Sequence, residues 1–108
     1  MTTSEVERRA RLALDAIVQA FGTTEDEFGA TMFVKHHLEE IPQSYWQQHL
    51  GANSPEPTAI IGLLELFSNW GDNDIENFDF SLPGNVTDYV ISVHFNSTGK
   101  IDGISMES

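Results

Sequence analysis

The spacing of apolar residues changes once along this chain of 108 residues, and that change constrains its fold more than any other feature. Up to Trp70, apolar residues recur every three or four positions, which is typical of helices with one buried face. After the polar run from Gly71 to Asp74 they recur at every second position, as in strands with one solvated face. Helices followed by strands indicate an α+β fold. The length fits a single domain, so we expect one α+β domain over residues 1–108.

Four helices are predicted before the change of period. Ser4 and Glu7 have the spacing of a capping box, in which two side chains satisfy free backbone N–H groups at a helix start. Thr24 and Glu27 repeat that spacing. Pro42 ends the second helix, because the residue before a proline avoids helical backbone angles. The predicted helices run from Ser4 to Phe21, from Thr24 to Glu40, from Gln43 to Leu50 and from Thr58 to Trp70.

Three strands are predicted after the change of period, as an antiparallel meander. They cover Phe78–Leu82, Tyr89–Phe95 and Lys100–Met106. Gly99 has the position of the left-handed residue in a hairpin connection. A three-stranded sheet with one apolar face must be covered. The predicted helix Thr58–Trp70 is apolar nearly all round, so we expect it to lie buried against this sheet.

The charge of the chain is strongly one-sided. Seventeen Asp and Glu against five Lys and Arg give a formal net charge of −12. After Leu12 the only basic residues are Lys35 and Lys100. A field of this sign repels phosphate backbones and attracts basic proteins, so the sequence disfavours nucleic-acid binding and favours a basic partner. The alternative interpretation is that the charge serves only solubility.

Three aromatic residues are candidates for binding. Tyr45 and Trp46 are adjacent in a short helix, so both cannot point inward. Trp70 is the third. Aromatic side chains within an acidic rim are typical of an interface for a basic protein. The alternative places Trp46 in the core with Tyr45 half-covered. The predicted partner-binding residues are Tyr45, Trp46, Asp72, Asp74, Glu76 and Asp79.

A metal site is a second hypothesis, which would make the chain a small metal-binding domain or a metal-dependent enzyme. His36 and Glu40 share a helix face at i,i+4 spacing, His37 is adjacent, and His49 comes from the next segment. Imidazole and carboxylate at this spacing ligate zinc or iron in other proteins. The alternative is that histidines near a helix C-terminus interact with the helix dipole. Because the pattern occurs once, without partner helices that repeat it, we expect no metal or other cofactor.

No catalytic motif stands out. Cysteine is absent, which excludes disulfides and thiolate chemistry. No Gly-x-Ser-x-Gly motif and no phosphate-binding glycine loop occurs. We therefore expect a protein that is not an enzyme.

Localisation and self-association are predicted from other features. No apolar run of 18 residues occurs, and the N-terminal residues lack the apolar region of a signal peptide, so we expect a cytoplasmic protein that does not bind membranes. The first or the third predicted strand must lie on a sheet edge, which allows self-association. A monomer or a weak homodimer is expected.

The C-terminal stretch resembles a known family. The segment from Phe78 to Ser108, which ends in Met-Glu-Ser, is similar to the end of a family of small uncharacterised bacterial proteins with a helical N-terminal half and a C-terminal hairpin. In size, acidity and α+β layout the chain is also similar to immunity proteins that neutralise polymorphic toxins. The resemblance implies a protein-binding role, immunity-like or regulatory, and supplies no site residue.

Overall fold

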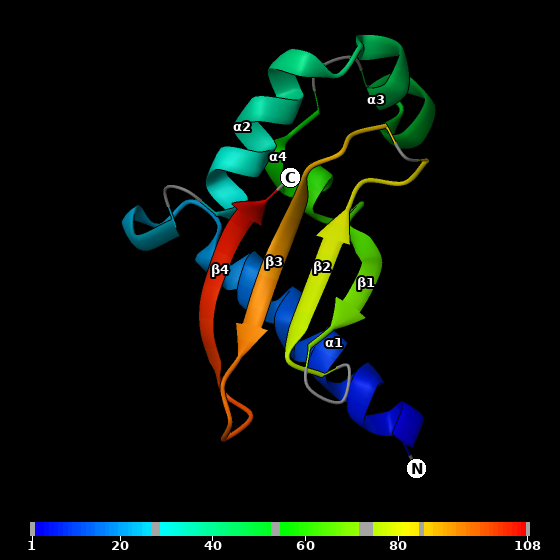
Figure 1. Cartoon of the computed structure of the whole chain (residues 1–108). Helices are drawn as coiled ribbons and strands as arrows, with labels where there is room; N and C mark the ends of the chain where they lie inside the picture. Colours follow the sequence, from blue (N-terminus) through cyan, green and yellow to red (C-terminus); the bar gives the residue numbers. More distant parts are fainter. Residues whose placement is uncertain (1, 27–28, 53–54, 72–74, 85, 108) are drawn as a thin grey trace.

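The computed structural model describes residues 2–26, 29–52, 55–71, 75–84 and 86–107. Four α-helices precede an antiparallel sheet (Figure 1), which confirms the α+β class. The helices are α1 (Thr2–Ala20), α2 (Ala30–Glu40), α3 (Gln43–Leu50) and α4 (Pro57–Ile61), with a 3-10 turn η1 (Thr24–Asp26) before α2. The strands are β1 (Glu65–Trp70), β2 (Asn77–Ser81), β3 (Val90–Phe95) and β4 (Ile101–Glu107). The described sheet therefore has four strands rather than the three predicted.

The extra strand comes from the segment predicted as the fourth helix. α4 ends at Ile61, with Gly62 as its C-terminal cap, and Glu65–Trp70 pairs with β2 as strand β1. A segment that is apolar all round carries no clear period, so periodicity could not separate a buried helix from a strand. The aromatic residues Phe67 and Trp70 favour a strand, and pairing with β2 satisfies the backbone of this segment. The predicted helix Thr58–Trp70 is therefore wrong beyond Ile61, and its second half belongs to the sheet that it was expected to cover.

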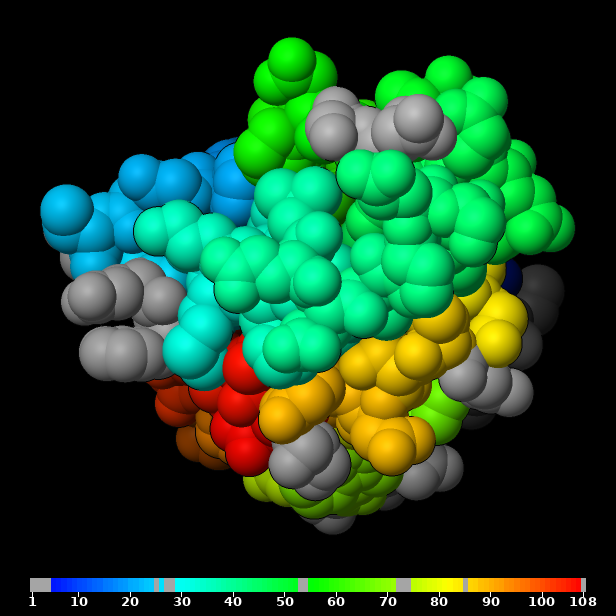
Figure 2. Space-filling model, turned by 90° about the horizontal axis from the view of Figure 1, so that it is seen from above, coloured from blue at the N-terminus to red at the C-terminus, as the bar shows by residue number. Residues whose placement is uncertain are grey.

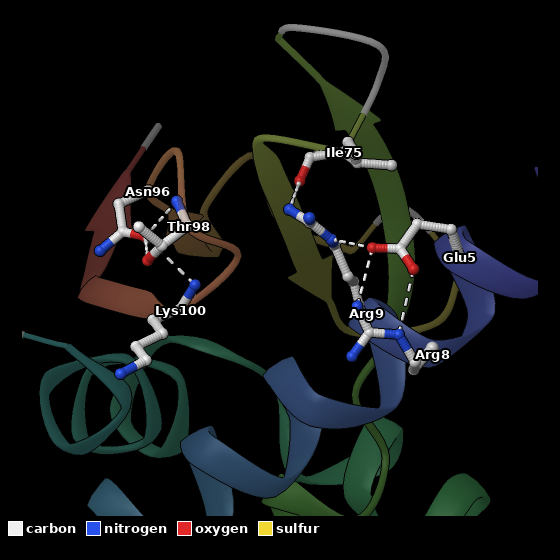
Figure 3. Close-up of polar contacts among 7 residues, drawn as sticks. All are labelled: Glu5, Arg8, Arg9, Ile75, Asn96, Thr98 and Lys100. Carbon is white, nitrogen blue, oxygen red and sulfur yellow. Dashed lines mark hydrogen bonds and ion pairs between the residues drawn. The ribbon is translucent and has the colours of Figure 1, made fainter.

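The sheet is a meander in the order β1-β2-β3-β4. Pairing β1 with β2 makes the first predicted strand, Phe78–Leu82, an inner strand. The edges are therefore β1 and β4. A register irregularity between Leu66 and Ser68 leaves Phe67 outside the regular β1–β2 ladder. Gly99 has φ +83°, as predicted for the β3–β4 hairpin, and the Asn96 carboxamide oxygen accepts hydrogen bonds from the N–H groups of Thr98 and Lys100 (Figure 3).

The helices lie on one face and at one end of the sheet. α1 crosses behind the sheet in Figure 1, and α2 and α3 lie side by side over one end of it (Figure 2). The core fills the space between these layers. Its largest fully buried side chains are Ile17, Phe33, Val34, His37, Trp46, Ile60, Phe78, Phe80, Ile91, Val93 and Phe95.

The starts of the first two helices differ from the predicted capping boxes. α1 begins at Thr2, so Ser4 lies within the helix rather than at its cap. α2 begins at Ala30, and Glu27 lies outside the described residues. The N–H groups of Ala30 and Thr31 instead donate to the buried Asp26 carboxylate, over 3.2 and 2.8 Å. The predicted ends at Glu40 and at Gly51, which has φ +69°, are confirmed.

Arg8 and Arg9, near the N-terminus, make contacts within the protein. Arg8 and Arg9 both donate to the Glu5 carboxylate, and Arg9 also donates to the Ile75 carbonyl oxygen (Figure 3). Hydrogen bonds from Arg8, and then from Arg9, lower the pKa of Glu5 to about 2. Both arginines thus share the single Glu5 carboxylate, and the bond from Arg9 to Ile75 attaches α1 to the segment before β2.

Candidate functional site

A hollow of about 700 Å³ lies on the face of the sheet that α1 does not cover. Successive strand residues point to opposite faces, so Asp79, Ser92 and His94 point away from the core. The floor of the hollow includes the small residues Ser92, Ser105 and Gly103. Ser92 pairs with Ser105, and Gly103 pairs with His94, across β3 and β4. A volume of this size is in the range of ligand-binding pockets, roughly 300–1,000 Å³.

Aromatic side chains from the edge strand line one side of the hollow. Phe67 is 61% exposed and Trp70 is 50% exposed. Leu66, which is also exposed, pairs with the core-facing Phe80 and does not line the hollow. Exposed apolar residues that gather on one surface mark binding sites more often than isolated ones do. The bulge at Phe67 is the local cause, because it places this side chain outside the regular alternation of the strand.

The Asp79 carboxylate lies next to this aromatic side. The Trp70 indole N–H donates to Asp79 Oδ2 over 2.9 Å, and the Ser68 hydroxyl donates to the same oxygen over 3.3 Å. The other oxygen, Oδ1, is shielded from solvent and accepts no hydrogen bond from the described residues. Buried polar atoms nearly always have a partner, so this oxygen is an exception that needs an explanation.

Further carboxylates lie toward both ends of the hollow. Asp88 and Glu107 line it, and Glu107 pairs with Val90 at the start of β3. Toward the other end, His94 Nδ1 lies 2.5 Å from an Asp102 oxygen, and His94 Nε2 lies 3.9 Å from a Glu76 oxygen.

Negative charge is therefore distributed along the length of the hollow. The four steps from Val90 to His94, both of which line the hollow, correspond to about 13 Å of extended chain. No Lys or Arg is among the described residues that line the hollow.

Only some of the predicted partner-binding residues lie at the hollow. Asp79 lines the hollow and Glu76 lies beside it, while Asp72 and Asp74 lie outside the described residues. Neither member of the predicted aromatic pair lines the hollow.

Tyr45 and Trp46 are instead held by the rest of the protein. Trp46 is 1% exposed, so its indole lies in the core and is not available to a partner. Tyr45 is half-buried, and its hydroxyl donates to the Pro83 carbonyl oxygen over 2.7 Å. The alternative interpretation, with Trp46 in the core and Tyr45 half-covered, therefore describes this pair.

Three of the lining residues, Phe67, Asp88 and Glu107, were not singled out from the sequence as site residues. Phe67 was interpreted as part of a buried helix, and Trp70 was named as a binding candidate but without Asp79 as its neighbour. The polar positions that alternate along β3 and β4 indicated which residues face away from the core, and these residues form part of the lining. The pairing of β1 with β2, which brings Trp70 to Asp79, depends on a strand that periodicity did not predict.

The alternative hypothesis of a metal site at His36, His37, Glu40 and His49 finds no support among the described residues. His37 is 1% exposed, and its two ring nitrogens contact the Phe33 carbonyl oxygen at 2.6 Å and the Thr87 hydroxyl at 2.8 Å. His49 packs against the Tyr45 ring, with 4.3 Å between centroids. In the part of the chain that the structure describes, no group of three or more His, Cys, Asp or Glu residues has the geometry to hold a metal ion.

Burial of His37 gives a prediction for the pH dependence of stability. Desolvation lowers the pKa of His37 from its ordinary value of 6.5, so the unfolded chain binds a proton more readily than the folded protein. The contribution of neutral His37 to the free energy of unfolding is complete above pH 6.5. It is lost as the pH falls below 6.5 toward the lower pKa that His37 has in the folded protein. The slope from this one group is at most about 1.4 kcal/mol per pH unit.

Urea unfolding of the wild type and of His37→Gln, each at several pH values between 7.5 and 5.5, checks this prediction. The variant lacks the titrating ring, so the stability difference between the two proteins should shrink as the pH falls. Parallel stability curves would contradict a neutral, buried His37.

No protein-family model, curated protein or solved structure matches this chain. Among the described residues, no helix has both the length and the apolar character needed to cross a membrane.

Proposed function

We propose that this protein is a binding module for a basic segment of another protein, and that the hollow on the open sheet face is its binding surface. The observation that carries the proposal is the lining of the hollow. Asp79, Asp88 and Glu107 combine there with the exposed rings of Phe67 and Trp70, and the described lining contains no Lys or Arg. Carboxylates and aromatic faces are the two kinds of group that attract Lys and Arg side chains.

The aromatic side gives such a segment an apolar contact. Lys and Arg carry long aliphatic stems, which pack on apolar surface while the charged group reaches a carboxylate. Phe67 and Trp70 offer that surface beside Asp79. Aromatic residues also dominate the binding energy of protein interfaces. The hollow therefore suits a segment with basic side chains better than a purely polar or purely apolar one.

The charge of the whole chain supports the same choice of partner. A formal charge of −12 speeds the approach of a basic protein and repels an acidic one. Neutralisation of a basic partner, as immunity proteins achieve with their toxins, is one role that this surface would serve. Regulation of a basic partner is another.

The test compares two variants of equal net charge. The hollow variant carries Asp79→Asn, Asp88→Asn and Glu107→Gln. The control variant carries Asp15→Asn, Glu39→Gln and Glu40→Gln, which neutralise three exposed carboxylates on the helices. The probe is the peptide Lys-Gly-Arg-Gly-Lys, blocked at both ends, and calorimetry measures its Kd.

We expect the hollow variant to bind the peptide about tenfold more weakly than the wild type, and the control variant to stay within about threefold. Affinity should also fall as salt rises, because exposed charges are screened over about 8 Å at physiological ionic strength. Equal losses in the two variants would show that only net charge matters and would reject the hollow as the binding surface. Absence of binding to the wild type at low salt would reject the proposal.

A further inference from the structure

We infer that the hollow holds one arginine side chain of its partner, with the guanidinium donating to Asp79 and lying against the Trp70 indole. This inference rests on the proposed function and makes it more specific, because it names the side chain that the centre of the hollow recognises.

The first step is the unequal use of the two Asp79 oxygens. Oδ2 accepts from the Trp70 indole N–H and the Ser68 hydroxyl. Oδ1 is shielded from solvent and has no donor among the described residues. Shielding a carboxylate oxygen from water without a donor is unfavourable, so a donor that arrives with a ligand removes an existing cost. Among the described residues that line the hollow, Asp79 is the one with such an oxygen.

The second step is the arrangement of the Trp70 ring. Its N–H is attached to Asp79 Oδ2, so the indole is held beside the carboxylate while half of its surface stays exposed. A guanidinium is planar, with donors in its plane, and can stack on an indole and donate to a neighbouring oxygen at the same time. A lysine ammonium has no plane to stack and keeps its water more strongly. The pairing of indole and carboxylate therefore favours arginine over lysine.

The third step is access to Oδ1. Because this oxygen is shielded in the free protein, binding includes a small movement of the side chains around it. Trp70 is half-exposed on an edge strand, and Phe67 lies in a bulge, so both have room to move without loss of the β1–β2 pairing. The indole N–H of Trp70 should therefore report the binding event directly.

The experiment uses three blocked peptides, Lys-Gly-X-Gly-Lys, in which X is arginine, lysine or citrulline. Citrulline has the shape of arginine without its charge. The outer lysines of an extended peptide lie about 13 Å apart, the same separation as Val90 and His94 on β3, so the central residue falls near Ser92 and its partner Asp79. NMR titration of the whole protein follows the Trp70 indole N–H signal, which is assigned by its loss in Trp70→Phe.

We expect the arginine peptide to bind about threefold tighter than the lysine peptide and about tenfold tighter than the citrulline peptide. The Trp70 indole N–H signal should shift most with arginine. Asp79→Asn should remove the preference for arginine, whereas Asp88→Asn and the helix control Asp15→Asn should keep it.

The outcomes separate this inference from the proposed function. If all three peptides shift signals of the hollow with equal affinity, the arginine contact is rejected and the basic-segment site stands. Equal affinity of the lysine and arginine peptides, both for the wild type and for Asp79→Asn, would also reject the guanidinium contact. If no peptide shifts signals of the hollow, both proposals fall.

Discussion

Trp46→Ala should lower the free energy of unfolding by about 3–5 kcal/mol, whereas Trp70→Ala should lower it by about 1 kcal/mol or less. Trp46 is 1% exposed and belongs to the core, so its removal leaves a cavity that the surrounding side chains fill only in part. Trp70 is half-exposed, and its loss removes mainly one hydrogen bond to Asp79. Urea unfolding followed by circular dichroism measures both changes.

A milder variant keeps this prediction testable if Trp46→Ala does not fold, because a domain of this size is stable by only about 5–15 kcal/mol. Trp46→Phe retains an aromatic ring and removes a buried indole N–H that has no hydrogen-bond partner among the described residues. The smaller ring leaves a small cavity, and the loss of the unpaired N–H offsets part of its cost. Trp46→Phe should therefore lower the free energy of unfolding by about 1–2 kcal/mol. In the wild type, acrylamide should quench the fluorescence of Trp70 and leave that of Trp46 nearly unchanged. If Trp70 proved the more protected and the more costly to replace, β1 would not be an exposed edge.

Part of the fold was predictable from the sequence. The alternation of apolar and polar residues predicted strands close to the observed β2 and β3, because a half-buried strand has a strict period of two. The ends of α2 and α3 followed from Pro42 and Gly51, whose backbone preferences are local. Features that depend on one residue and its neighbours were thus predicted well.

The site was predictable only in part, because it depends on contacts between distant segments. Asp79 was chosen for its charge, and the structure places it in the hollow. Trp70 was assigned mainly to a buried helix, because a segment that is apolar on all sides does not reveal which side will be covered. Pairing of β1 with β2 decides this, and it leaves the ring of Trp70 beside Asp79. Adjacent aromatics such as Tyr45 and Trp46 suggested an interface, but packing of α3 against the core buries Trp46.

The start of α2 provides the second large stability prediction. Asp26→Ala should lower the free energy of unfolding by about 2–3 kcal/mol. The carboxylate is 6% exposed and accepts from the N–H groups of Ala30 and Thr31 and from the Thr31 hydroxyl. Its removal leaves two N–H groups at a buried helix start without an acceptor. The Thr31 hydroxyl also accepts from the Gly22 N–H, so the same contacts connect the end of α1 to α2.

Gly29 supplies the control for this arrangement. A Cβ at position 29 would overlap Asp26 Oδ1 and would lie 3.2 Å from the Ile104 carbonyl oxygen, so Gly29→Ala should displace the carboxylate and destabilise the protein to a similar degree. In the double variant Asp26→Ala/Gly29→Ala the overlap with the carboxylate is gone. The double variant should therefore cost clearly less than the sum of the two single variants in urea unfolding. Strict additivity would mean that the two residues act independently, and Asp26 would then not be the group that requires glycine at position 29.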